Sequence, residues 1–162
     1  TKLSSTVCPF FILDAFKSAV SDSNNIRYSK DGGDLSNSDI IVAVIGEKPY
    51  SEGVGDRDSL HLSDEDITLI EKVKRSKLPF VVILISGRPM IINEVLDDSD
   101  AFIAAWLPGT EGLGISDVVF GDFDFTGKLS MTWPKSMKQI PINYGDSSYD
   151  PLFKFGFGLS YE

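Results

Sequence analysis

Cysteine and histidine are nearly absent from this sequence, with one residue of each in 162 positions. The lone Cys8 excludes an internal disulfide and cannot by itself build a metal site, because a structural zinc ion takes about four ligands. No Gly-x-Ser-x-Gly motif accompanies the lone His61, so a Ser-His-Asp triad is not expected. These scarcities argue against a disulfide-stabilised fold and against serine hydrolase chemistry.

Basic residues and long apolar runs are also scarce. The 15 Lys and Arg residues are outnumbered by 24 Asp and Glu residues, and the resulting net charge of −9 opposes binding to a phosphate backbone. The longest apolar run, 101–107, is far shorter than the roughly 18 to 20 residues that cross a bilayer. We therefore expect neither a nucleic-acid partner nor a membrane span.

The amino terminus lacks the basic and then apolar segments of a secretion signal. Thr1 stands where an initiator methionine would be, which is expected of a fragment or a processed chain. The cellular compartment is therefore left open.

The sequence does contain three apolar runs of strand length, at 40–45, 80–85 and 101–106. Uninterrupted runs rich in β-branched residues indicate strands that are covered on both faces of a parallel sheet. Helical patterns are found at 10–20, from the Ser63 cap to about 76, at 91–96 and at 115–120. Strands alternating with helices predict a three-layer α/β/α sandwich with a mostly parallel sheet, formed as one domain by residues 1–162.

The carboxy-terminal part of the chain has a different pattern. Residues 129–133 are predicted to add an edge strand, and residues 26–29 form a further candidate strand nearer the start. From position 146 onward regular periodicity is lost, but aromatic residues stay frequent. A free tail would rarely expose so many aromatic rings, so we expect an ordered segment that wraps against this domain or a neighbouring one.

The loop 46–56 follows the first apolar strand and carries three carboxylates and three glycines. In open α/β sheets, ligands bind just beyond the carboxyl ends of the strands, so this loop is the first candidate site. Glu47 lies nearest the strand, and we expect it to bind loop amides in a structural role. Asp56 and Asp58 are candidates to bind a cation with Glu52, although calcium usually takes about six to eight oxygens from a dedicated loop.

Several motifs, in this order along the chain, resemble the second domain of family 3 glycoside hydrolases, and the similarity is greatest to the β-glucosidase and β-glucan exohydrolase branch. They cover nearly the whole chain. They lie at 46–56, 84–89, 105–112, 120–122, 127–134 and 149–161.

The resemblance implies a two-domain enzyme in which a (β/α)8 barrel supplies the nucleophilic Asp and the α/β sandwich supplies the general acid/base Glu. That Glu matches Glu52 in the loop Pro49-Tyr50-Ser51-Glu52-Gly53. The 162 residues are fewer than the roughly 250 of such a barrel, so the chain is expected to hold half of an active site.

The implied activity is hydrolysis of β-glucosides or β-glucans with retention of configuration. A retaining glycosidase needs two carboxylates about 5 to 5.5 Å apart, and this chemistry implies no organic cofactor and no catalytic metal. The isolated chain is expected to be nearly inactive. The alternative is a non-catalytic module that binds carbohydrate or packs between domains.

Other motifs leave competing interpretations. Asp122-Phe123-Asp124-Phe125-Thr126 imitates the Asp-x-Asp-x-Thr motif of aspartyl-phosphate phosphatases, but that motif normally follows the first strand. Arg88 is expected either to reach a ligand or to brace a loop. Trp106 and Trp133 are more typical of a core than of a sugar-stacking platform. The glycines at 109, 112 and 114 fit no nucleotide-binding spacing.

Overall fold

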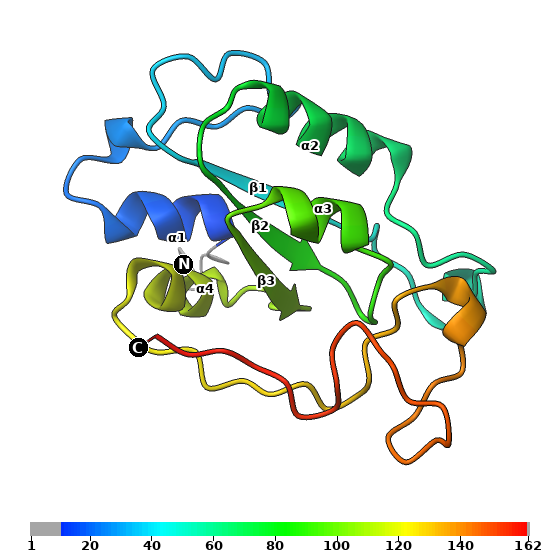
Figure 1. The fold of residues 1–162 in the computed structure, drawn as a ribbon. Helices are drawn as coiled ribbons and strands as arrows, with labels where there is room; N and C mark the ends of the chain where they lie inside the picture. Colours follow the sequence, from blue (N-terminus) through cyan, green and yellow to red (C-terminus); the bar gives the residue numbers. More distant parts are fainter. Residues whose placement is uncertain (1–10, 162) are drawn as a thin grey trace, which may run out of the picture. The chain divides into compact units, whose positions relative to one another are not determined.

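Three parallel strands form the sheet of the computed structural model, which describes residues 11–161 (Figure 1). The strands are β1 (Ile41–Gly46), β2 (Phe80–Ile85) and β3 (Ala101–Trp106), and they lie side by side in the order β1-β2-β3. The central strand is the most buried, because Val82, Ile83 and Leu84 have no exposed surface. The predicted α/β class with a parallel sheet is therefore confirmed, and the three apolar runs are its strands.

The described residues divide into two compact units. The sheet unit comprises residues 30–107 and 127–159, and the helical unit comprises residues 11–29, 108–126 and 160–161. That residues 1–162 form one sandwich domain stays a prediction.

Helices α2 (Asp64–Arg75) and α3 (Asn93–Asp98) belong to the sheet unit and lie over the same face of the sheet (Figure 1). The predicted Ser63 cap is confirmed, because its hydroxyl accepts a hydrogen bond from the Asp66 amide at 3.1 Å. Helix α2 packs against β1 and buries Ile70 and Val73 in the core. An N-terminal cap and a buried apolar stripe explain why the helix begins and docks here.

The carboxy-terminal segment of the sheet unit is ordered without forming a strand. Trp133 makes a single antiparallel bridge to Phe153, and its indole donates to the Met90 carbonyl at 2.8 Å. Phe153 in turn stacks on Phe157, with ring centroids 4.5 Å apart. The predicted wrapped aromatic segment is confirmed. The predicted edge strand at 129–133 is wrong, because backbone bonds of this segment go to residues 152–157 and not to the sheet.

The other candidate strand, at 26–29, is also wrong. A 3₁₀ helix, η1 (Ser23–Asn25), precedes these residues, and Asp22 caps it by accepting from the Asn24 amide at 2.9 Å. Residues 26–29 have no regular secondary structure. A short polar stretch with a side-chain cap favours this local turn over strand geometry.

The helical unit contains α1 (Ile12–Ala19) and α4 (Gly112–Phe120), which pack together through an edge-to-face contact between Phe16 and Phe120. Helix α4 ends at Gly121, whose φ of +86° gives the left-handed C-cap that glycine adopts without steric cost. The first position of the helix predicted at 10–20 lies outside the described residues. Within residues 11–161, no helix is both long and apolar enough to cross a membrane.

Candidate active site loop

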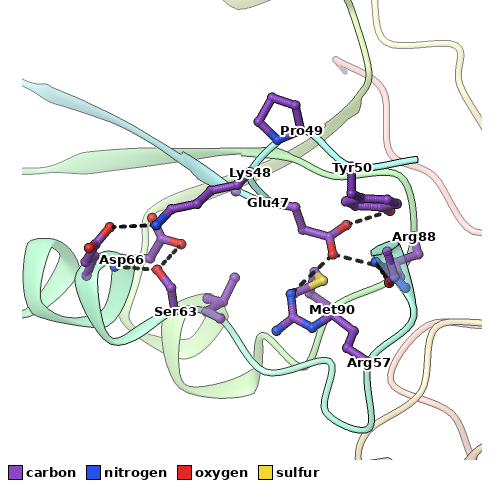
Figure 2. Close-up of a pocket in the computed structure, with 13 residues that line it drawn as sticks. Glu47, Lys48, Pro49, Tyr50, Arg57, Ser63, Asp66, Arg88 and Met90 are labelled. Atoms are coloured by element: carbon purple, nitrogen blue, oxygen red, sulfur yellow. Dashed lines mark hydrogen bonds and ion pairs between the residues drawn. The ribbon is translucent and has the colours of Figure 1, made fainter. Parts of the chain in front are cut away.

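Gly46, the last residue of β1, pairs with Ile85, the last residue of β2, with no room for a side chain at this position. Gly46 has a φ of +155°, and a Cβ at this position would lie 2.0 Å from the Ile85 carbonyl oxygen. The next amide, that of Glu47, donates to the same oxygen at 2.9 Å. Glycine is therefore required here, and the Glu47 side chain that follows it points toward Arg88 in the loop after β2 (Figure 2).

Glu47 is the most enclosed ionisable group of the loop, with only 4% of its side chain exposed. Its Oε1 accepts from Arg88 Nε at 3.0 Å and from Arg57 Nη1 at 3.3 Å. Its Oε2 accepts from the Tyr50 hydroxyl at 3.0 Å and from the Gly87 amide at 3.3 Å. The predicted structural role of Glu47 is confirmed, and the amide that it binds, that of Gly87, comes from the loop after β2.

The Tyr50 side chain packs directly against the backbone of Gly55 and Gly87. A Cβ on Gly55 would lie 2.2 Å from Tyr50 Cδ2, and a Cβ on Gly87 would lie 2.6 Å from the Tyr50 hydroxyl oxygen. The Arg88 guanidinium carbon is 4.4 Å from the ring centroid, within the range of a cation–π contact. Partial burial, and then the hydrogen bond to and negative charge of Glu47, raise the pKa of Tyr50 above 10.0, while Arg88 opposes this shift.

The two arginines tie this cluster to the rest of the loop. Arg88 Nη2 donates to the Gly55 carbonyl at 2.7 Å, and Arg57 donates to the carbonyls of Ser59 and His61 at 2.6 and 3.0 Å. Of the two roles expected for Arg88, the structure shows the bracing of a loop. We call Glu47, Tyr50, Arg57 and Arg88 the Glu47 cluster.

Glu52 lies on the exposed outer part of the same loop. It begins the short 3₁₀ helix η2 (Glu52–Gly55) with a φ of +44°, in the left-handed region that costs a non-glycine residue roughly 1–3 kcal/mol. Among residues 11–161, no side chain forms a hydrogen bond or an ion pair with Glu52. Its neighbour Val54 is 88% exposed. Glu52 is thus free to meet a group outside the sheet unit.

A cavity of about 320 Å³ lies on the inner side of the loop (Figure 2). Glu47, Arg57 and Arg88 line it together with the first turn of α2, and Glu52 does not. Within the part of the chain that the structure describes, no group of three or more His, Cys, Asp or Glu residues could hold a metal ion. Among these described residues, Glu52, Asp56 and Asp58 therefore do not come together as a set of cation ligands.

The phosphatase-like motif does not have the position that the phosphatase interpretation needs. Asp122 and Asp124 follow helix α4 in the helical unit, not the end of a strand. The Asp124 carboxylate accepts from the Tyr161 amide at 2.7 Å, which gives it a local structural role. Of the tryptophans, Trp133 is buried in the core and Trp106 is half-buried, with its ring 5.9 Å from that of Trp133.

Sequence reasoning missed the roles of Tyr50 and Arg57. Arg57 lies ten positions after its partner Glu47, and no helical or strand period links the two residues. One sequence feature could have indicated the Tyr50 contact. Gly55 and Gly87 lie in the loops after β1 and β2, and neither belongs to a phosphate-binding motif.

Comparisons with known proteins agree with the fold. The model of the glycosyl hydrolase family 3 C-terminal domain matches residues 3–161. A β-xylosidase of Formosa agariphila is 33% identical over 94% of this chain and 26% of its own length. A periplasmic β-glucosidase of Salmonella typhimurium is 32% identical over 76% of this chain and 19% of its own length.

Among solved structures, an exo-1,3/1,4-β-glucanase from a Pseudoalteromonas species has a TM-score of 0.87 and 41% identity, over 94% of this chain and 20% of the glucanase. The chain therefore spans about a fifth to a quarter of the length of these three proteins. Because the family model covers nearly every residue, the chain belongs to the C-terminal domain family of family 3 glycoside hydrolases.

Proposed function

We propose that this chain is the acid/base domain of a retaining glycoside hydrolase that acts on β-glucosides or β-glucans. The observation that carries the proposal is the position of Glu52, which is exposed, unpartnered within the described residues and held on the loop at the carboxyl end of β1. Family membership and the glucosidase and glucanase names of the relatives support the substrate class.

Glu52 would act twice in each catalytic cycle. It first protonates the glycosidic oxygen as the sugar is transferred to a nucleophilic Asp, and then removes a proton from the water that releases the sugar. The nucleophile would come from a barrel domain, since the chain spans only about a fifth to a quarter of its relatives. The proposed chemistry uses two carboxylates about 5 to 5.5 Å apart and no cofactor.

The loop suits this role because its two faces differ. Its inner face is anchored by buried Glu47, whereas its outer face presents an acidic side chain with no partner inside the described part of the sheet unit. A proton donor must come within about 2.6 to 3.2 Å of the leaving oxygen, so it has to project from its own domain toward a substrate held by another.

The test is a chimera in which this chain replaces the matching fifth of the Pseudoalteromonas glucanase. Hydrolysis of an aryl β-glucoside by the chimera is expected, with almost none from this chain alone or from the glucanase that lacks the region. A chimera that folds and binds sugar without hydrolysing it would support the non-catalytic module instead.

A further inference from the structure

The Glu47 cluster holds both ends of the segment that carries Glu52. Residues 51–54 separate Tyr50 from Gly55, and the Tyr50 ring packs against Gly55 so tightly that a Cβ there would overlap it. Arg88 holds the Gly55 carbonyl at 2.7 Å, and Glu47 holds the Tyr50 hydroxyl at 3.0 Å. The backbone on each side of Glu52 is therefore fixed by buried or half-buried groups.

We propose that Glu47 is a positioning residue for Glu52, acting through Tyr50 and Arg88. This inference rests on the proposed acid/base role of Glu52. A 1 Å misplacement of a catalytic group costs about 100-fold in rate, so the ties at Tyr50 and Gly55 bear directly on proton transfer. The strained φ of +44° at Glu52 is held by the same ties.

Glu47 is poorly suited to exchange protons with a substrate itself. Only 4% of its side chain is exposed, and its two oxygens accept from four donors, which are Arg88, Arg57, Tyr50 and Gly87. Its negative charge lies between two guanidinium groups, both of which also hold backbone carbonyls of the same region. Glu47 therefore fixes the positions of other groups and leaves the chemistry to Glu52.

The experiment measures the chimera described above with three substitutions, Glu47→Gln, Tyr50→Phe and Glu52→Gln. Glu71→Gln is the matched control, because Glu71 forms an exposed ion pair with Arg75 on α2. Each variant is assayed with an aryl glucoside that needs acid assistance and with one whose leaving group departs without it. Rates are expressed per folded molecule, as measured by circular dichroism and active-site titration.

Positioning predicts that Glu47→Gln lowers kcat/KM, which reports the acid-assisted step, about 100-fold on the substrate with the poor leaving group and far less on the activated one. The limb of the pH profile that reports the acid is retained, because Glu52 is still present, whereas Glu52→Gln removes that limb. Tyr50→Phe lowers the same rate by about 2- to 10-fold, in line with the loss of one hydrogen bond.

Two results overturn the inference. If Glu47→Gln or Tyr50→Phe lowers kcat/KM equally for both substrates, or for neither substrate, Glu47 has a structural role alone. Should Glu47→Gln fail to fold, Tyr50→Phe decides, because it keeps the ring and removes only the hydroxyl. Full activity of Glu52→Gln would instead remove the proposed function, so the two failures are distinguishable.

Discussion

The Tyr50 hydroxyl donates to Glu47 Oε2 at 3.0 Å, and this bond closes the loop that carries Glu52 against the end of the sheet. Both residues belong to the same loop, yet they meet the loop after β2 through the Gly87 amide and the Arg88 side chain. The stability of this arrangement is testable in the isolated chain, apart from any activity.

Glu47→Gln is expected to lower the free energy of unfolding by roughly 1–3 kcal/mol, since it leaves the partly exposed Arg57 and Arg88 without their shared carboxylate. Urea unfolding of the isolated chain measures this loss. The control Glu71→Gln is expected to change stability by less than about 0.5 kcal/mol, because its ion pair is exposed. Equal effects of the two substitutions would show that Glu47 is not an anchor.

Gly55→Ala and Gly53→Ala form a matched pair within η2. The added methyl group at 55 would meet the Tyr50 ring at 2.2 Å, whereas a methyl group at 53 has no atom within 4 Å. Overpacking predicts a loss of about 1–3 kcal/mol for Gly55→Ala. Gly53→Ala is expected to be neutral or slightly stabilising. Thermal unfolding of both variants checks the contrast, and a tolerated Gly55→Ala would contradict the observed packing of Tyr50.

Glu52→Gly is expected to stabilise the isolated chain by roughly 0.5–1 kcal/mol, because glycine adopts a positive φ at no steric cost. Glu52→Ala keeps the strained conformation and is the control, with little change expected. Both variants would abolish acid/base function in the chimera. Stabilisation together with lost activity is the pattern expected where a strained residue is kept for its chemistry.

The raised pKa of Tyr50 predicts a specific pH dependence at high pH. Because the folded state favours the neutral phenol, its contribution to stability is fully present below the unfolded pKa near 10.0 and is lost as the pH rises through the folded value. Ultraviolet titration of the tyrosines should show a late ionisation that Tyr50→Phe removes. An unchanged titration curve in that variant would refute the assignment.

The sequence predicted the three strands and the four main helices because each has a strong local signal. The apolar runs at 40–45, 80–85 and 101–106 and the cap at Ser63 are examples. The sequence did not distinguish edge strands from the central strand. The apolar run of β1 resembles that of β2, yet Val44 in the edge strand β1 is 42% exposed. The segment 129–133 has residues typical of a strand. Its backbone hydrogen bonds go to residues 152–157 and not to the sheet, and this pairing depends on tertiary contacts.

Only the parts of the candidate site that belong to a sequence motif or lie next to a strand end could be predicted. The resemblance singled out Glu52, and proximity to the strand singled out Glu47 for a structural role. The bonds from Arg57 and Tyr50 to the Glu47 carboxylate depend on how the loop folds back on itself, which no residue spacing encodes.

The most direct measurement of the central claim is the ratio of the kcat/KM values of Glu52→Gln and unmodified chimera on two aryl β-glucosides with poor and good leaving groups, because kcat/KM reports the step in which the leaving oxygen is protonated. A general acid contributes about 10²- to 10⁴-fold, so the loss should be of this size for the poor leaving group and much smaller for the good one. Unchanged turnover of the substrate with the poor leaving group would contradict the account.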